Sequence, residues 1–517
     1  MAWKPGDGPL RLPPPPADGF STSDRELRAD VVILGAGPGG SAAAREFARM
    51  GASVVILEEG PAESRFRPNQ GNVMRYHMQE GGGMVAMGSG GAFMPIAAGR
   101  GLGGSTLVNS AISWRAPDHI LQEWAELLKE EHWSPAAMKP YYDEVWELLG
   151  VCQPQSDEVA GANNRLIVRG AQALGYEGGY LDRYTPQCQG CGICYFGCPS
   201  GGKSSTNLHM LPEAVQNGAR IQADCKVREF LLEGDRVVGV RGQLHHPDTR
   251  EPGGKVTVYA EKVIVACGGI GTPRLLHHSG LAEKLGPAVG KGLHVHPGNL
   301  VAGICEERIE LWHGATQGAW FKIPELPGVL PHTFSAPPEV CLLLQGSLGQ
   351  DVKKGMQELP HLCGAVVMVS DKGEGTVSAW DDGRAYITYE FAPDDLERTK
   401  KGMYHTARVL LAGGAKEVFA PVHGTGRYTD ADSLMAAIQP KKLRDFQLYA
   451  AHPMSTCRMG LDPQTSVVRP DGRTHHLEGL YLMDGSIFPT SLGVNPSITI
   501  FAMVTAMARR MAGGAAP

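Results

Sequence analysis

The segment DVVILGAGPGGSAAAREFARMGASVVILEEG, residues 30–60, decides the fold. Its two apolar runs, 31–34 and 53–58, have the β-branched composition of strands that are buried on both faces. A glycine-rich turn and an alanine-rich stretch of helical composition separate the two runs. This strand–helix–strand order is typical of a doubly wound parallel sheet, so the sequence predicts an α/β fold.

Gly35, Gly37 and Gly40 give the pattern GxGxxG directly after the first run. The first glycine permits a tight turn, the second lets the backbone approach a pyrophosphate, and the third allows the helix to pack closely on the strand. Glu58 ends the second run, where a carboxylate can accept hydrogen bonds from ribose hydroxyls, whereas Glu59 should point to the other side of the strand. The pattern predicts a dinucleotide site. By itself it does not distinguish FAD from NAD, and a glycine-rich turn that binds no ligand has the same pattern.

Length and charge narrow the class of protein. A chain of 517 residues is too long for one compact core and predicts two domains. Its net charge of -6 argues against a nucleic-acid partner. The absence of any run of eighteen apolar residues predicts that there is no transmembrane segment. Residues 1–28 have no signal-peptide core, and PPPP at 13–16 predicts an extended arm. We therefore expect a cytoplasmic protein, with export beside a signal-bearing partner left open.

Further motifs follow in order along the chain: GRGLGGSTLVN (99–109), VIVACGGIGTPRLLHHSG (263–280), AHPMSTCRMG (451–460) and LYLMDGSIFPTSLGVNPSITIFAMVTAMARR (480–510). In this order and spacing they resemble the glucose–methanol–choline (GMC) family of FAD-dependent alcohol oxidoreductases. SLGVNPSITI (491–500) and a cysteine loop at 188–198 look most like the long-chain alcohol oxidases and related bacterial enzymes of that family.

The resemblance implies an α/β protein, α+β overall, in which a Rossmann-like FAD domain is interleaved with a substrate-binding cap containing an antiparallel sheet. The expected FAD domain comprises residues 29–117, 201–300 and 441–517, and the expected cap comprises 118–200 and 301–440, including the cysteine loop.

The resemblance also assigns cofactor contacts. It places Gly103, Gly104 and Ser105 against the flavin and the pyrophosphate, and Asn109 beside the isoalloxazine. Val108 stands where some family members bond a histidine covalently to the flavin. We therefore expect FAD to be held non-covalently.

More contacts come from later motifs. Val227 matches the position that pairs with the adenine, and Asp484 and Gly485 match the segment over the ribityl chain and phosphates. From the residues alone, Val227 could equally be an ordinary strand residue and Asp484 a turn residue. Asn495 and Pro496 predict the start of a helix, with Asn as the N-cap and Pro in the first turn. The family places this helix N-terminus at the flavin pyrimidine.

His452 is the predicted catalytic base. The family uses the histidine of an HPxGT motif to take the hydroxyl proton of the alcohol, a role that contributes roughly 100- to 10,000-fold to the rate. Asn495 stands at the second family position, and because an amide cannot take a proton it should bond the substrate oxygen. Ser455 replaces the glycine usual in this motif, which puts the loop geometry in doubt. His296 also matches a family motif and is predicted to be structural.

The loop CQGCGICYFGCP follows the ferredoxin spacing C-x2-C-x2-C-x3-C with Cys188, Cys191, Cys194 and Cys198. Such a compact array fits zinc poorly. The spacing predicts a [4Fe–4S] cluster on all four thiolates, or a [3Fe–4S] cluster on three, with a remote cysteine such as Cys225 as a substitute. A metal-free structural loop, zinc and disulfides stay open.

Together these observations predict an FAD-dependent dehydrogenase that oxidises a small, hydrophobic alcohol to an aldehyde or ketone. It would pass electrons through the iron–sulfur cluster to an external acceptor such as another protein. The alternatives are an oxidase that reduces O2 with a metal-free cysteine loop, and a non-catalytic flavin/Fe–S electron carrier. The pair His452 and Asn495 argues against the carrier.

Overall fold

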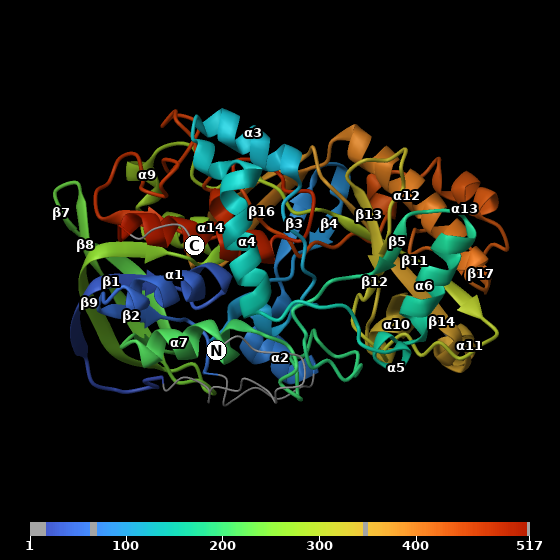
Figure 1. Cartoon of the computed structure of the whole chain (residues 1–517), viewed down its shortest axis with the longest axis horizontal. Coiled ribbons are helices and arrows are strands. Elements are labelled where there is room, and N and C mark those ends of the chain that lie inside the picture. Colours follow the sequence, from blue (N-terminus) through green and yellow to red (C-terminus); the bar gives the residue numbers. More distant parts are fainter. Residues whose placement is uncertain (1–16, 63–69, 345–349, 514–517) are drawn as a thin grey trace.

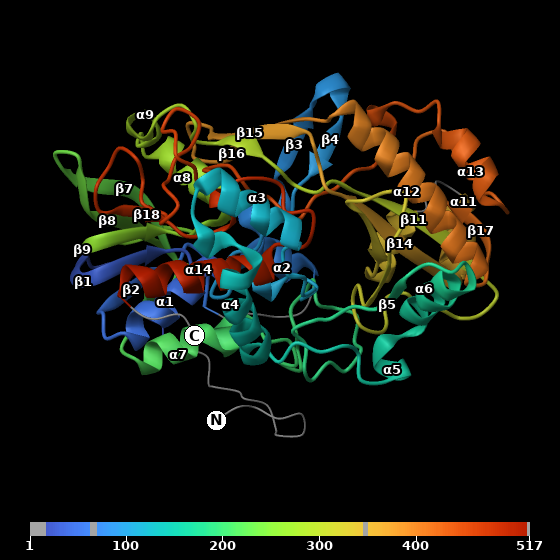
Figure 2. The same ribbon diagram turned by 45° about the horizontal axis from the view of Figure 1, so that its top comes forward.

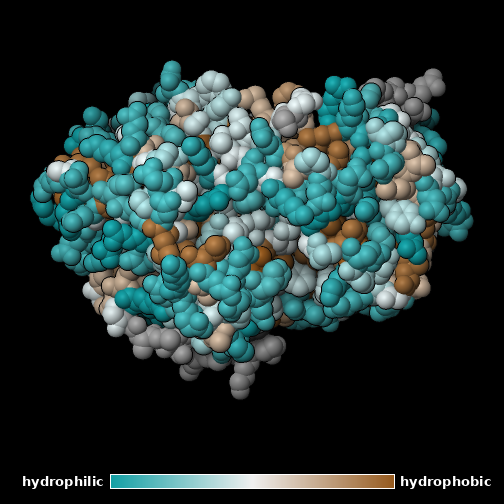
Figure 3. All heavy atoms as spheres, turned by 90° about the horizontal axis from the view of Figure 1, so that it is seen from above, coloured by the Kyte–Doolittle hydropathy of each residue, from teal (hydrophilic) through white to brown (hydrophobic). Residues whose placement is uncertain are grey.

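The computed structural model describes residues 17–62, 70–344 and 350–513, so the tetraproline at 13–16 lies outside the described residues. Two lobes lie side by side (Figure 1). On the face seen from above the surface is largely hydrophilic, with the hydrophobic atoms in separate small patches (Figure 3). None of the described helices is both long and apolar enough to span a bilayer.

The first lobe is built on a seven-stranded sheet. Its path runs β6 (Arg220–Gln222), β2 (Val54–Leu57), β1 (Arg25–Leu34), β9 (Pro252–Val265), β8 (Arg236–His245) and β7 (Cys225–Glu233), with β18 (Leu480–Leu482) beside β9. The predicted parallel pair is confirmed, because β1 and β2 run in register from Val31↔Val54 to Leu34↔Leu57. The strands β7, β8 and β9 form an antiparallel extension of this parallel sheet.

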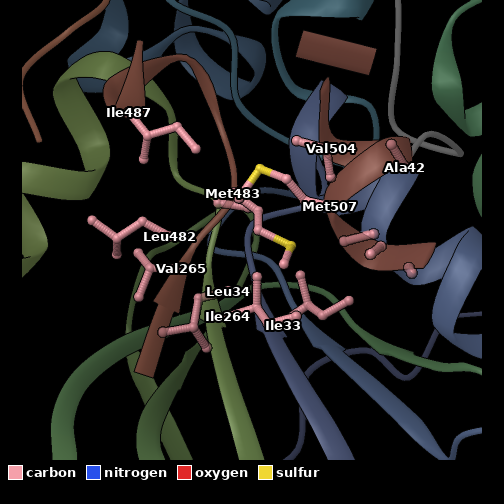
Figure 4. Packing of buried hydrophobic residues seen from close by; sticks show 14 of the residues in the cluster. Ile33, Leu34, Ala42, Ile264, Val265, Leu482, Met483, Ile487, Val504 and Met507 are labelled. Carbon is pink, nitrogen blue, oxygen red and sulfur yellow. The ribbon is translucent and has the colours of Figure 1, made fainter. Parts of the chain in front are cut away.

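Helices α1 (Pro38–Arg49) and α14 (Ser497–Met511) contribute to the core beside this sheet. Figure 4 shows Ile33 of β1, Val265 of β9 and Leu482 of β18 gathered near Met507 of α14. All four side chains are almost completely buried. Each buried aliphatic side chain contributes about 1.5–3 kcal/mol. The continuous apolar runs of the sequence are therefore the central strands of this core.

The second lobe carries a six-stranded sheet whose strand pairs are antiparallel. Its order is β17 (Ala415–Phe419), β11 (Gly298–Cys305), β14 (Leu362–Val369), β13 (Val329–Thr333), β12 (Ala319–Phe321) and β5 (Gly178–Tyr180). Helices α6 (Ala162–Ala173) and α12 (Pro393–Ala412) pack on it, and α13 (Ala431–Ile438) packs on α12. The fold prediction of a doubly wound domain with an antiparallel second domain is confirmed.

A third, five-stranded sheet lies between the lobes (Figure 2). It joins β10 (Lys291–Leu293), β15 (Glu374–Ala379), β16 (Ala385–Glu390), β3 (Val85–Gly88) and β4 (Phe93–Pro95). It thus combines segments assigned by sequence to different domains. Helices α3 (Asp118–Leu128) and α4 (Pro135–Leu148), expected in the cap, contribute Trp124 and Tyr142 to the core of the first lobe. The domain boundaries stay predictions.

Seven further α-helices belong to the described chain. They are α2 (Gln70–His77), α5 (Asp157–Ala160), α7 (Met210–Gln216), α8 (Gly268–His278), α9 (Ala282–Leu285), α10 (Pro338–Leu344) and α11 (Gln350–Glu358).

Candidate active site

A cavity of about 490 Å³ is lined by residues of both lobes. The N-terminal ends of α1, α8 and α14 all border it, at Pro38, Gly268 and Ser497. Free N–H groups and positive dipole ends at helix N-termini suit phosphates and other anions. The wall contains most of the predicted site residues: Gly35, Gly37, Glu58, Gly104, Ser105, Asn109, Val227, His452, Asp484, Gly485, Asn495 and Pro496.

The two remaining residues of the predicted catalytic and cofactor set, Gly40 and Gly103, lie outside this wall. A Cβ on Gly40 would collide with the carbonyl oxygen of Gly35, so its role is the close packing of α1 on β1. Gly35 itself has φ +99°, in the left-handed region that favours glycine. The nearest atom to a Cβ on Gly37 would be the Cα of Gly104, at 3.9 Å. Gly37 therefore leaves open space in front of its backbone, as a pyrophosphate requires.

Glu58 lines the cavity and also holds together two backbone segments that border it. Its carboxylate accepts hydrogen bonds from the backbone N–H groups of Ala36 (2.8 Å), Gly60 (2.8 Å) and Gly101 (3.0 Å). These bonds join the β1–α1 turn to the segment 99–109. Burial raises the pKa of Glu58, although the three N–H groups oppose this. The lone pairs of the Glu58 carboxylate that these three bonds leave free could accept hydrogen bonds from ribose hydroxyls.

Glu59 lies in the cavity wall as well, so the prediction that it points away is wrong. The physical reason is that β2 ends at Leu57, and the alternation of a strand no longer applies beyond it. Glu59 pairs with Arg274 at 3.2 Å. Burial raises the pKa of Glu59, but the charges of Arg274, Arg100 and Lys226 outweigh it and lower the pKa to about 2.

Arg274 is a wall residue that the sequence did not single out. The sequence could have indicated Arg274 by its position, because it lies inside the motif at 263–280, in the helix that follows β9. A buried arginine in such a helix needs a carboxylate partner.

Asn109 and Asp484 are held by local networks. The Asn109 amide donates to the Tyr184 hydroxyl and to Oγ of Ser497 (3.4 Å). Asp484 accepts from the Gly268 N–H (2.8 Å) and from Oγ1 of Thr272 (2.6 Å). Asp484 therefore ties the end of β18 to the first turn of α8, beyond the role of a simple turn residue.

His452 and Asn495 meet in the cavity wall. Asn495 Nδ2 donates to His452 Nε2 at 2.9 Å. His452 Nδ1 and Asn495 Oδ1 are buried and have no hydrogen-bond partner within the described chain. Burial lowers the pKa of His452 well below its usual value, and the neighbouring His296 and His332 lower it further. His452 is therefore neutral and able to accept a proton.

The predicted N-cap role of Asn495 is wrong. The helix α14 begins at Ser497, and Pro496 occupies the cap position. The Pro496 carbonyl accepts from the Ile500 N–H at 2.9 Å. The Asn495 amide bonds His452 instead of capping the helix, because α14 starts one residue later than an Asn cap would require.

Two neighbours shape the position of His452. The rings of His296 and His452 have centroids 5.5 Å apart, and His296 Nε2 accepts from the Gly493 N–H at 2.9 Å. Ser455 has φ +68°, a conformation that favours glycine. This accounts for the glycine that the family usually has at this position.

The four cysteines of the loop are not grouped as metal ligands in the described residues, so the iron–sulfur cluster stays a prediction. All four cysteines have free thiols. Arg183 Nη2 donates to Cys194 Sγ at 3.3 Å, and the Lys203 N–H donates to Cys198 Sγ at 3.3 Å. In the part of the chain that the structure describes, no group of three or more His, Cys, Asp or Glu side chains is arranged to hold a metal ion. The spacing of the cysteines does not indicate which protein groups donate hydrogen bonds to the Cys194 and Cys198 sulfurs.

The same loop is attached to the cavity. Lys203 is almost fully buried, and its Nζ donates to the carbonyls of Leu107 (2.8 Å), Asn109 (3.0 Å) and Cys194 (3.1 Å). Burial lowers the pKa of Lys203 to about 8. Tyr195 of the loop lines the cavity. The loop therefore braces the segment that carries Asn109.

Comparison with known families settles the class. Residues 74–298 match the family model of the GMC oxidoreductase N-terminal region, and residues 370–503 match the C-terminal one. The chain belongs to the GMC oxidoreductase family. This membership makes FAD its cofactor and the protein an oxidoreductase.

Relatives and structures agree with this assignment. An uncharacterized GMC-type oxidoreductase of Mycobacterium tuberculosis is 32% identical over 93% of this GMC chain and 75% of its own. Long-chain-alcohol oxidase FAO4A of Arabidopsis thaliana is 29% identical over 93% of this chain and 68% of its own. Pyridoxine 4-oxidase from Mesorbium loti has the same fold, with TM-score 0.71 and 17% identity over 93% of this chain and 98% of its own.

Proposed function

We propose that this GMC oxidoreductase oxidises a hydrophobic alcohol to the aldehyde or ketone, with His452 as the general base and Asn495 as the hydrogen-bond donor to the substrate oxygen. The observation that carries the proposal is the His452–Asn495 pair, 2.9 Å apart in the wall of a cavity bordered by three helix N-termini. Relatives named long-chain-alcohol oxidases support it.

The proton step follows from the neutral imidazole. An aliphatic alcohol is a very weak acid, so its hydroxyl proton has to move to a base as the C–H bond breaks. His452 Nε2 holds the lone pair that accepts this proton once the alcohol replaces Asn495 as its partner. Asn495 Nδ2 then donates to the alcohol oxygen and fixes its position.

Bound FAD would supply the hydride acceptor that the oxidation of the carbinol carbon requires. The chain's own contribution is electrostatic. The N-terminus of α14 at Ser497 favours negative charge at its end of the cavity. The N-termini of α1 and α8 likewise favour the negative charge of phosphates. With Val108 in the wall there is no histidine for a covalent flavin bond at that position, so the cofactor is held non-covalently.

The substrate side of the cavity is largely apolar. Its wall includes Ile112, Phe334, Val340, Val366 and Met368. Such a wall gains about 25 cal/mol for each Å² of apolar substrate surface that leaves water. This favours an alcohol with a hydrocarbon body over a sugar.

For the second half of the reaction we propose a dissolved acceptor, O2, which matches the oxidase names of the relatives. The iron–sulfur route predicted from the cysteine spacing is not part of this proposal, because in the described residues no three His, Cys, Asp or Glu side chains are arranged to hold a metal ion. No step is assigned to the loop.

The test is anaerobic bleaching of the flavin absorbance by a panel of aliphatic, aromatic, sterol and sugar alcohols. The expected result is rapid bleaching by hydrophobic alcohols, recovery of the colour on admitting O2, and peroxide formation. Iron and acid-labile sulfide are measured on the same sample and should be absent. Stoichiometric iron, together with a flavin colour that does not return in O2, would favour a dehydrogenase with an iron–sulfur cluster instead. A flavin that no alcohol bleaches would refute the proposal.

A further inference from the structure

One polar side chain of the cap faces the cavity without a protein partner for one of its atoms. His332 lies on β13, opposite Val366 of β14, and its side chain forms part of the cavity wall. Cross-strand partners share a face, so His332 sits on the apolar face that Val366 gives to the cavity. The residue is only 3% exposed. It is therefore a buried polar group beside apolar wall residues such as Val366.

The tautomer of His332 follows from its one hydrogen bond. Nδ1 lies 3.1 Å from the carbonyl oxygen of Leu330 on the same strand. A carbonyl only accepts, so Nδ1 carries the proton and Nε2 holds a lone pair. Burial lowers the pKa of His332 to about 4, so the ring stays neutral above that pH and Nε2 stays an acceptor.

The only hydrogen bond of the His332 ring among the described residues is the one made by Nδ1, so Nε2 is left without a protein partner there. An acceptor that a substrate covers without bonding it costs about 1–3 kcal/mol. The neighbouring polar wall residue Ser335 differs, because its hydroxyl already donates to the Leu311 carbonyl at 2.6 Å. His332 thus offers a vacant acceptor to whatever fills the cavity.

The reacting hydroxyl cannot satisfy this acceptor. It has a single proton, and the proposed function gives that proton to His452. We propose that His332 determines specificity by accepting a hydrogen bond from a second donor on the substrate, so that the substrate class is a hydrophobic alcohol bearing another hydroxyl, such as a long diol. This rests on the proposed function, because it assumes that the first hydroxyl is the one oxidised.

The test compares straight-chain primary alcohols with the matched α,ω-diols over a series of lengths, by anaerobic flavin bleaching of the holoenzyme. At one length the diol should exceed the mono-alcohol in kcat/KM by roughly tenfold or more. His332→Leu should reduce this diol advantage about tenfold, and His332→Gln, which keeps an acceptor, should restore part of it. Val366→Ala, the matched control on the facing strand, should shift both substrates by the same factor.

A second measurement separates binding from chemistry. Tertiary alcohols with and without a second hydroxyl cannot give a hydride, and their dissociation constants are read from the perturbed flavin spectrum. The diol should bind more tightly to the wild type, and His332→Leu should abolish the difference. Equal losses for both ligands in His332→Leu, or no diol advantage at any length, would overturn the inference. If no alcohol bleaches the flavin, the proposed function fails while this binding comparison still decides the role of His332.

Discussion

The two walls of the cavity are built in different ways. The wall from the first lobe is rich in close-packed backbone, with glycines such as Gly37 and Gly104 and the N-termini of three helices, and we call this part the backbone wall. The wall from the cap consists of side chains on a sheet, among them His332, Val366 and Met368. The backbone wall suits a cofactor that does not change, since few substitutions leave its geometry intact. The side-chain wall can be altered residue by residue, which suits the recognition of a particular substrate.

The largest structural effect is expected in the backbone wall. Gly104 has φ +51°, and a Cβ on it would lie 2.7 Å from the Cα of Gly37. Gly104→Ala should therefore abolish FAD binding or prevent folding, because the strained conformation alone costs about 1–2 kcal/mol and the backbone contact adds to it. The measurement is the ratio of flavin to protein absorbance after purification.

Gly175→Ala is the matched control for that substitution. Gly175 has φ +71°, but nothing lies within 4 Å of a Cβ built on it. This variant carries the same conformational strain without the contact, and it should keep its full FAD content. Equal FAD content in Gly104→Ala and Gly175→Ala would mean that the close backbone contact at Gly104 is not needed for FAD binding, which would contradict the account of the backbone wall.

Lys203→Met tests the brace between the cysteine loop and the backbone wall. The substitution leaves the carbonyls of Leu107, Asn109 and Cys194 without their buried donor. We expect the free energy of unfolding in urea to fall by about 2–5 kcal/mol, with partial loss of FAD.

The exposed Lys139 gives the control for Lys203. It bonds Asp143 at 2.5 Å, and 67% of its side chain is exposed. Lys139→Met should cost less than about 1 kcal/mol. A Lys203→Met protein as stable as Lys139→Met would mean that the loop does not support the site.

Acid should destabilise the protein through buried neutral histidines of both walls. Burial lowers the pKa of His296 and of His332 to about 4, and their usual value is 6.5. Between these values the unfolded chain binds more protons than the folded one, so stability is present above pH 6.5 and is lost as the pH falls toward 4. Each group contributes up to about 1.4 kcal/mol per pH unit in this window.

Urea unfolding measured from pH 7 to pH 5 checks the acid effect. In His332→Leu the dependence of the free energy of unfolding on pH should be shallower, because one of the titrating groups is gone. An unchanged dependence would show that His332 is solvated in the folded protein.

The smallest effect is expected at Ser455. Glycine would relieve the strain of φ +68°, about 1–2 kcal/mol, but would lose the hydrogen bond from Oγ to the Thr490 carbonyl at 3.2 Å. The two terms nearly cancel, so Ser455→Gly should change the free energy of unfolding by less than about 1 kcal/mol. A large loss of stability would mean that the Oγ bond fixes the His452 loop.

The sequence predicted the backbone wall well, because its geometry demands glycine and short apolar runs at fixed spacing. It failed at Glu59, since no pattern in 53–58 marks Leu57 as the end of the strand. The cluster at the cysteine loop stays a prediction, because a ferredoxin-like spacing does not say which groups bond the sulfurs, and here Arg183 and the Lys203 N–H bond two of them. His332 carried no motif at all, because a side-chain wall depends on how distant strands pair.

The central claim is that His452 takes the proton of the alcohol. The most direct measurement is the rate of anaerobic flavin bleaching by the best alcohol of the panel, in the wild type and in His452→Ala at equal FAD content. The predicted result is a rate roughly 100- to 10,000-fold lower in the variant, partly restored by added imidazole. A rate within a few-fold of the wild type would contradict the account.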